Sequence, residues 1–237
     1  MEHWEYLKPD GQRFVWDDML FRPGTDSFLL SSLPKLSAGL RVCDLGCGTG
    51  LLGLLLLQRQ SELTITGIDI QPAAVALAER AAAENCLTDR LTFQCIDLRQ
   101  VRQHFSTGSF DLVVCNPPYY PPASGKVSGD SARRTARSET EASLADICAA
   151  ASYLLRWGGK FCLVHKPERL GEILSVGGKF RLEGKALTLV RHRPGGDIAM
   201  ILVRLRKGAK PGLAIREITL TDEAGNPTED YRSMYHL

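Results

Sequence analysis

The stretch LRVCDLGCGTGL, Leu40–Leu51, decides the fold because a strand, a glycine loop and the start of a helix follow one another within it. Residues 40–45 have the apolar character of a short buried strand, and the leucine-rich residues 51–60 predict a helix. Glycine lets the backbone between them turn sharply and approach a ligand closely. A tight turn between a strand and a helix needs no ligand, so these glycines alone leave a structural and a ligand-binding interpretation open.

Strand and helix patterns alternate in the residues that follow. We expect a helix that opens at Pro72 and ends near residue 84, and a second helix that runs from a capping box at Ser138–Glu141 to Gly158-Gly159. The expected strands are residues 63–69, 91–96, 110–115 and 160–164. Strands that are separated by single helices predict a parallel sheet with right-handed crossovers, and therefore an α/β fold.

The pattern changes after residue 180. Residues 186–190 and 199–205 both predict strands, and the eight residues between them cannot hold a crossover helix, so this pair is expected to be antiparallel. Residues 213–220 then predict a strand, residues 222–226 a turn, and the last residues a short helix. Residues 1–39 are irregular, apart from a helical pattern at 27–33.

Size and composition allow one large domain with a full core, because the chain has 237 residues of which 44% are hydrophobic. We expect residues 1–39 to cap the site, residues 40–210 to form the ligand-binding domain, and residues 211–237 to pack on that same domain. Seven cysteines without a C-x-x-C pair indicate reduced thiols and a cytoplasmic location, and none has a histidine at ligand spacing, so no metal is expected. The longest apolar run, residues 51–57, is too short to span a bilayer, and no signal peptide pattern is present, so no membrane partner is expected.

Three aspartates indicate which ligand the glycine loop binds. Asp69 and Asp97 end the second and third strands, at the edge where open α/β sheets bind ligands, and an acid at the position of Asp69 accepts hydrogen bonds from ribose hydroxyls. A dinucleotide fingerprint requires glycine where Leu51 stands. Asp44 would repel a pyrophosphate and would suit an ammonium group. S-adenosylmethionine carries an ammonium, a sulfonium, a ribose and an adenine without phosphate, so it is the expected cofactor.

The motif DLGCGTG at residues 44–50, the acids at the strand ends and the motif NPPY at residues 116–119 together resemble class I methyltransferases over roughly residues 25–206. The resemblance implies a Rossmann-like fold with helices on both faces of a seven-stranded, mostly parallel sheet whose last strand is antiparallel. It also implies a cofactor site in which glycines line the methionyl part, Asp69 binds the ribose and Asp97 lies beside the adenine. The cofactor-binding set is then Asp44, Gly46, Gly48, Gly50, Asp69, Asp97 and Asn116.

The NPPY corner suits methylation of an amino group on a planar system. Such a nitrogen is a poor nucleophile because its lone pair is delocalised, and attack on a sulfonium methyl requires it to pyramidalise. The side-chain oxygen of Asn116 and the carbonyl of Pro117 can accept its two N–H groups, and the prolines hold both acceptors in place. Tyr119 can stack on a flat substrate. The sulfonium is already a good leaving group, so no strong general base is needed. The predicted catalytic residues are therefore Asn116, Pro117 and Tyr119.

Basic residues near this corner favour an RNA substrate. The glycine- and serine-rich residues 124–138 carry four cations against Asp130, where a nucleic-acid backbone would pass. A second basic group, Arg191-His192-Arg193, lies in the expected hairpin turn, and Arg204, Arg206, Lys207 and Lys210 follow it. An RNA could bridge these groups if the turn lies at the substrate edge of the sheet. The residues expected to contact RNA are Tyr119, Tyr120, Lys126, Arg133, Arg134, Arg137, Arg191 and Arg193.

The chain further resembles the bacterial family that methylates the adenine 3′ of the anticodon, adenosine 37, at N6 in valine tRNA. The similar stretches are Thr25–Leu30, Ala136–Glu139, Leu163–Leu170 and Lys210–Leu213. Ser138 stands where a histidine is commoner in that family. The resemblance implies an adenine-N6 RNA methyltransferase with tRNA as its substrate.

Three alternatives remain open at this point. Protein glutamine-N5 methyltransferases share NPPY, although they usually carry an N-terminal helical domain and only 43 residues precede Asp44 here. An N-methyltransferase of ribosomal RNA bases is a second alternative. An RNA-binding module with a relic cofactor site is the third, and the intact Asn116 and loop glycines argue against it.

Overall fold

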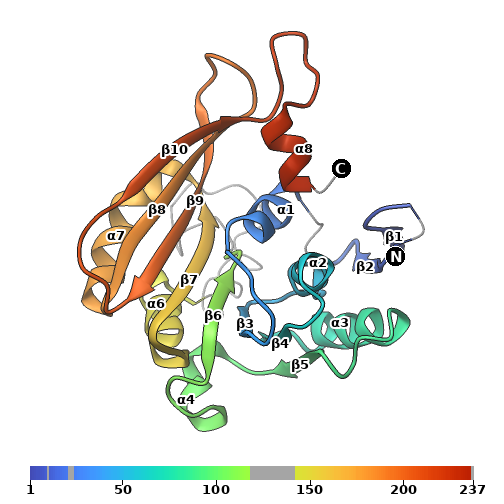
Figure 1. The fold of residues 1–237 in the computed structure, drawn as a ribbon. Coiled ribbons are helices and arrows are strands. Elements are labelled where there is room, and N and C mark those ends of the chain that lie inside the picture. Colours follow the sequence, from blue (N-terminus) through green and yellow to red (C-terminus); the bar gives the residue numbers. More distant parts are fainter. Residues whose placement is uncertain (10, 21–23, 118–141, 236–237) are drawn as a thin grey trace, which may run out of the picture.

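A computed structural model describes residues 1–9, 11–20, 24–117 and 142–235. Within these ranges one sheet has the strand order β10-β8-β9-β7-β6-β3-β4-β5 (Figure 1). The parallel strands of the sheet's centre and one side are β3 (Arg41–Leu45), β4 (Thr64–Asp69), β5 (Leu91–Cys95), β6 (Phe110–Cys115) and β7 (Leu155–His165). β9 (Ile198–Lys207) is antiparallel to both β7 and β8 (Leu182–Arg191). The Rossmann-like sheet and the antiparallel hairpin are therefore confirmed.

The sheet is one strand wider than the seven-stranded arrangement that the family resemblance implies. β10 (Ala214–Thr219), which the sequence predicts as a strand of the tail, pairs in parallel with β8. β8 would otherwise be an edge strand with an unpaired ladder of N–H and C=O groups, and the tail satisfies that ladder. α8 (Glu229–Tyr235) follows β10, and its Met234 is buried in the same apolar cluster as Ile218 of β10.

Helices cover both faces of the sheet and give it two apolar clusters. On one face α6 (Leu144–Leu154), α7 (Leu170–Lys179) and the short α4 (Val101–His104) contribute to a cluster with Phe161, Leu163 and Val203. On the other face Val164, Leu202 and Met200 share a cluster with the remaining helices. These are α1 (Thr25–Ser32), α2 (Leu51–Arg59), α3 (Pro72–Glu84) and α8. Two 3₁₀ turns, η1 (Leu98–Gln100) and η2 (Pro167–Arg169), lie between these elements.

The ends of α6 differ from the prediction. The helix ends at Leu154, and Gly158 and Gly159 lie inside β7, where the pairing register with β6 shifts. The predicted helix end was wrong, because a glycine pair is also found where a strand has a bulge. The capping box expected at residues 138–141 lies outside the described residues. The described helix begins with a different box, in which Ser143 Oγ accepts from Asp146 N at 3.2 Å and Ser143 N donates to Asp146 Oδ2 at 2.9 Å.

The N-terminal residues form a hairpin that the sequence does not reveal. β1 (Glu2–Tyr6) and β2 (Arg13–Asp17) are antiparallel, and Asn85 at the end of α3 holds β2. Asn85 Oδ1 accepts from Arg13 N at 2.8 Å, and its Nδ2 donates to Arg13 O at 2.7 Å. No helix in the described ranges is both long and apolar enough to cross a bilayer.

Candidate active site

The glycine loop lies where the carboxyl ends of β3, β4 and β6 meet. Leu45, the last residue of β3, is in register with Ile68 of β4 and Cys115 of β6. The carbonyl of Ile68 accepts from the N–H groups of Gly46 at 2.9 Å and Cys47 at 3.0 Å, which ties the loop to β4. Gly46 and Gly48 have φ of +73° and +53°, and a Cβ on either would meet no atom of the described residues within 4 Å. The loop therefore borders open space at these two residues.

Gly50 has a different environment. Its φ is +82°, and a Cβ there would lie 2.6 Å from Phe93 Cζ and 3.1 Å from Ala78 Cβ. Gly50 therefore allows close packing of the loop on the core. Its predicted contact with the cofactor stays a prediction.

Asp69 connects the end of β4 to the glycine loop. Its Oδ2 accepts from Gly48 N at 2.9 Å, and its Oδ1 accepts from Gln71 N at 2.9 Å. The residue is buried, with 8% of its surface exposed. Each carboxylate oxygen can accept a further hydrogen bond, so the carboxylate can bind hydroxyl groups while it stays oriented by the backbone.

Asp44 is buried next to these groups, and its Oδ2 has no hydrogen-bond partner in the described part of the chain. Burial, together with the negative charge of Asp69, raises the pKa of Asp44 to about 8. A buried acceptor without a donor costs free energy. Asp44 therefore suits a ligand that brings a positively charged donor, as an ammonium group does.

Asp97 is held by a neighbour that the sequence does not point to. It caps η1, and its Oδ1 accepts from the backbone N of Arg99 and from Arg99 Nε, both at 2.9 Å. The Arg99 side chain and backbone lower the pKa of Asp97. Asp97 is thus an oriented carboxylate beyond the end of β5, and its predicted position beside the adenine stays a prediction.

Asn116 directly follows β6, and its amide lies against α1. Its Nδ2 donates to the hydroxyl of Ser27, 3.1 Å away. Ser27 is 7% exposed, and Pro117 is also buried. The sequence places Ser27 in a stretch of family resemblance but does not predict this contact, which joins residues 89 positions apart. Predicted site residues that lie outside the described ranges are Tyr119, Tyr120, Lys126, Arg133, Arg134 and Arg137.

The turn between β8 and β9 lies at the same edge of the sheet as Asn116. His165, the last residue of β7, is in register with Ile201, so β9 begins beside the carboxyl end of β7. Arg193 in this turn is exposed. Arg191 instead pairs with Glu217 of β10, with Nε and Oε1 2.7 Å apart, so it contributes to the contact between β8 and β10.

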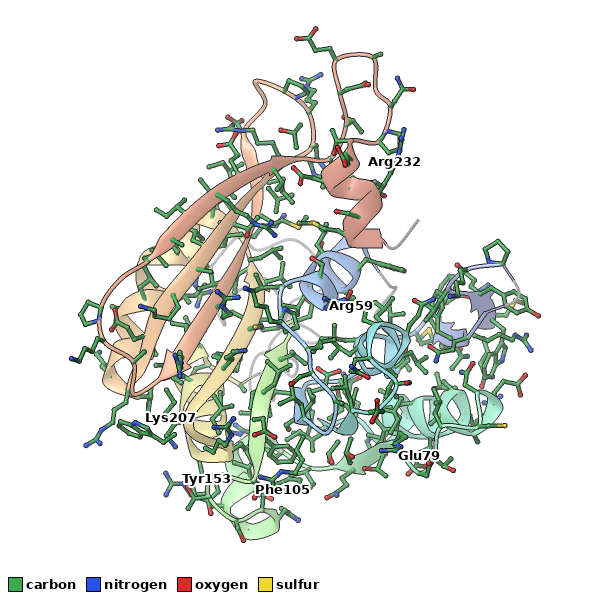
Figure 2. The ribbon with its side chains drawn as sticks, viewed as in Figure 1. Arg59, Glu79, Phe105, Tyr153, Lys207 and Arg232 are labelled. Atoms are coloured by element: carbon green, nitrogen blue, oxygen red, sulfur yellow. The ribbon has the colours of Figure 1, made fainter. Side chains whose placement is uncertain are left out.

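The later basic residues lie at the other end of the sheet. Arg206 is in register with Lys160 of β7. Lys160 is in turn in register with Leu112, near the start of β6. Lys207 Nζ donates to the carbonyls of Ser152 at 2.5 Å and Leu155 at 2.8 Å, and so caps the end of α6. Figure 2 shows Lys207 at the end of the strands opposite to α8. Residues 204–206 are thus separated from the turn by the length of β9, and the expectation that one RNA contacts both basic groups stays a prediction.

The described side chains include no group of three or more His, Cys, Asp and Glu residues that could hold a metal ion. The features gathered at the carboxyl edge are a glycine loop that borders open space, a buried acid, an oriented strand-end acid and an Asn-Pro corner.

The sheet and this edge together define a methyltransferase of the class I type. The model of the methyltransferase small domain family matches residues 21–172. A tRNA1(Val) (adenine(37)-N6)-methyltransferase of Yersinia enterocolitica is 32% identical over 81% of this chain and 76% of its own length. That of Serratia proteamaculans is 30% identical over 92% of this chain and 83% of its own. The chain belongs to the methyltransferase small domain family and, within it, to the family of these adenine-N6 methyltransferases.

Solved structures agree with this fold. The crystal structure of a predicted O-methyltransferase from Agrobacterium tumefaciens has a TM-score of 0.74 at 23% identity, and the match covers 89% of this chain and 95% of the other. A geranyl diphosphate methyltransferase in complex with S-adenosylmethionine has a TM-score of 0.56 at 17% identity, over 76% of this chain and 83% of the other.

Proposed function

We propose that this chain transfers the methyl group of S-adenosylmethionine to N6 of adenosine 37 in valine tRNA. The observation that carries the proposal is the position of Asn116, which the fold sets at the same sheet edge as the glycine loop and Asp69. Relatives named for this reaction share 30–32% identity with most of the chain, and their activity supports the same substrate here.

The described residues fit the cofactor. Asp44 would meet its ammonium group, the open side of Gly46 and Gly48 would accommodate the methionyl part, and Asp69 would accept from the ribose hydroxyls. Asp97 and Gly50 complete the cofactor-binding set, with Asn116 between cofactor and acceptor. S-adenosylmethionine supplies an electrophilic methyl group on a sulfonium. Because Gly48 N–H donates to Asp69, cofactor and loop are held by the same carboxylate.

Asn116 and Pro117 orient the acceptor amine. The amide oxygen of Asn116 and the carbonyl of Pro117 accept the two N–H groups of adenine N6, which localises the lone pair and directs it at the methyl group. Ser27 accepts from Asn116 Nδ2 and so fixes the plane of the amide. Acceptors that are already in place need little reorganisation during the reaction. The proton that the nitrogen loses afterwards passes to solvent.

The RNA reaches this edge with its base turned out of the anticodon loop. Tyr119 stacks on the adenine, and Tyr120 and Arg193 contact the RNA, together with the cations of the loop at residues 124–138 and Arg191. Residues 1–39 cap the site through α1, and residues 211–237 pack on the same domain through β10 and α8. The chain acts in the cytoplasm, without a metal or a membrane partner.

Mass spectrometry of nucleosides tests the proposal directly. Purified protein is incubated with S-adenosylmethionine and unmodified valine tRNA, with ribosomal RNA and a protein extract in parallel. We expect N6-methyladenosine in valine tRNA and none in a tRNA that carries guanosine at position 37. Methylated glutamine without any modified nucleoside, or methylation of ribosomal RNA alone, would overturn the substrate assignment. A protein that binds no S-adenosylmethionine would be a relic.

A further inference from the structure

One side of the sheet carries cations from three strands, β7, β9 and β10. Along β7 and β9, Lys160, Arg204 and Arg206 point to the same side as Val164 and Leu202, because side chains alternate along a strand and the pairing register aligns these positions. Arg216 of β10 is in register with Thr188 and donates to its hydroxyl at 3.0 Å, so it is on this side as well. We call the four residues and Lys35 the cationic sheet face.

This face is exposed because its helices cover only half of it. Val164, Leu202 and Met200 are buried in the cluster that includes α1 and α8. Nearer the other end of the strands, Arg206 and Arg216 are exposed, and Lys160 and Arg204 are half-buried. Figure 1 shows α1 and α8 beside the upper ends of these strands, with α6 and α7 on the opposite face.

The cations of this face form no ion pair with an acid within the described ranges. Glu183 is in register with Arg206 and forms no ion pair with it. Burial, and then the positive charges of Arg204, Arg206 and Lys35, lower the pKa of Lys160. Cations that disfavour one another in this way are stabilised by an anionic ligand.

The length of α1 separates the cationic sheet face from the Asn-Pro corner. Ser27 of α1 contacts Asn116, and Lys35 follows the end of α1 by three residues. Asn116 follows Cys115, which is in register with Leu163, so Lys160 lies four residues, or about 13 Å at ~3.3 Å per residue, along the sheet from the level of Asn116. β10 lies three strands from β7, or about 14 Å across at ~4.8 Å per strand. A surface of this size can contact several phosphates, since a duplex carries a charge about every 1.7 Å of its axis.

We propose that the cationic sheet face binds the sugar-phosphate backbone of the tRNA outside the anticodon loop. This proposal rests on the proposed function, because it takes the substrate to be tRNA. The catalytic edge accommodates one base and its neighbours, so the rest of the anticodon arm crosses the adjacent surface. Phosphate contacts of this kind position an RNA without reading its sequence.

Neutralising the face tests the proposal. The variant Lys160→Gln, Arg204→Gln, Arg206→Gln is compared with the control variant Arg90→Gln, Arg102→Gln, Lys179→Gln, whose exposed cations lie on other elements. Both variants change the net charge by −3, so a general loss of attraction affects them equally. The dissociation constant of full-length unmodified valine tRNA is measured from 50 to 300 mM KCl, and that of S-adenosylmethionine serves as the check of folding.

We expect the face variant to bind tRNA about 100-fold more weakly at 0.15 M salt, with a salt slope reduced by about 2, because each lost phosphate contact reduces the slope by ~0.7 to 0.9. Its affinity for S-adenosylmethionine stays at the wild-type value. A tRNA affinity and slope equal to those of the control variant would overturn the proposal. So would loss of binding to phosphatidylserine vesicles with tRNA binding retained, which would assign the face to a lipid surface.

The two proposals fail separately. A wild-type protein that binds tRNA but forms no N6-methyladenosine contradicts the proposed function. A wild-type protein that methylates valine tRNA, together with a face variant that binds it normally, contradicts the cationic sheet face alone.

Discussion

An Asp44→Asn variant tests whether the buried Asp44, which we propose binds the cofactor, lowers the free energy of unfolding of the cofactor-free protein. The pKa of Asp44 is about 8 in the folded protein, against 3.8 for the ordinary group. Between pH 3.8 and about 8 the carboxyl group of Asp44 is protonated in the native state and ionised in the unfolded state. Raising the pH therefore removes stability, at about 1.4 kcal/mol for each pH unit. From pH 5 to pH 7 the loss is on the order of 2.7 kcal/mol.

Urea unfolding at pH 5, 6 and 7 without cofactor measures this term. The other titrating groups are common to wild type and variant, so the difference between the two pH profiles isolates Asp44. We expect the wild-type free energy of unfolding to fall with pH relative to that of Asp44→Asn. Parallel profiles would refute the argument, because they would mean that Asp44 is already ionised in the free protein.

The same titration couples to cofactor binding. An ammonium group beside Asp44 favours its carboxylate, so binding at pH 6 to 7 releases a proton and the affinity rises by up to about tenfold per pH unit. Calorimetry in buffers of different ionisation enthalpy detects the released proton. The Asp44→Asn variant should bind S-adenosylmethionine weakly and release none. Equal proton release by both proteins would assign it to another group.

Four other substitutions distinguish the roles of the remaining site residues. Asp69→Ala should weaken S-adenosylmethionine binding at least tenfold, since a hydrogen bond to a charged acceptor contributes about 1.5–3 kcal/mol, and an unchanged dissociation constant by calorimetry would remove Asp69 from the site. Asn116→Ala should lower kcat by on the order of a hundredfold, and Ser27→Ala by roughly fivefold, the effect of one neutral hydrogen bond. The affinity for S-adenosylmethionine should stay unchanged in the Asn116 and Ser27 variants. If both variants lose that affinity, the contact between Asn116 and Ser27 has a structural role. Gly50→Ala should destabilise the fold by about 2–4 kcal/mol in urea unfolding, through its positive φ and the contact with Phe93, and the added change Phe93→Leu should restore part of the loss. An unchanged free energy of unfolding would contradict the packing role of Gly50.

Local patterns in the sequence predicted the parallel sheet and the antiparallel pair β8 and β9. Alternating strands and helices from residue 40 onward predict parallel pairing, and the short link after residue 190 leaves antiparallel pairing for β8 and β9. The carboxyl ends of parallel strands meet at one edge, so the positions of Asp69 and Asn116 after their strands already predict that they belong to one site. The N-terminal hairpin was not predicted, because the anchor that holds it, Asn85, is 72 positions away from Arg13 in the sequence.

The sequence by itself determined the class of fold, the edge at which the site lies and the acids and amide around it, because these follow from local periodicity and from the direction of the strands. Only the tertiary structure decided which distant groups touch. The contact of Ser27 with Asn116 depends on how α1 packs on the sheet. The cationic sheet face depends on register. The side and the level at which Lys160 and Arg204 point are set by the pairing of β7 with β9, in which Lys160 lies opposite Arg206 and Cys162 opposite Arg204. A shift of one residue would turn such side chains to the opposite face, and local sequence does not specify which register is adopted.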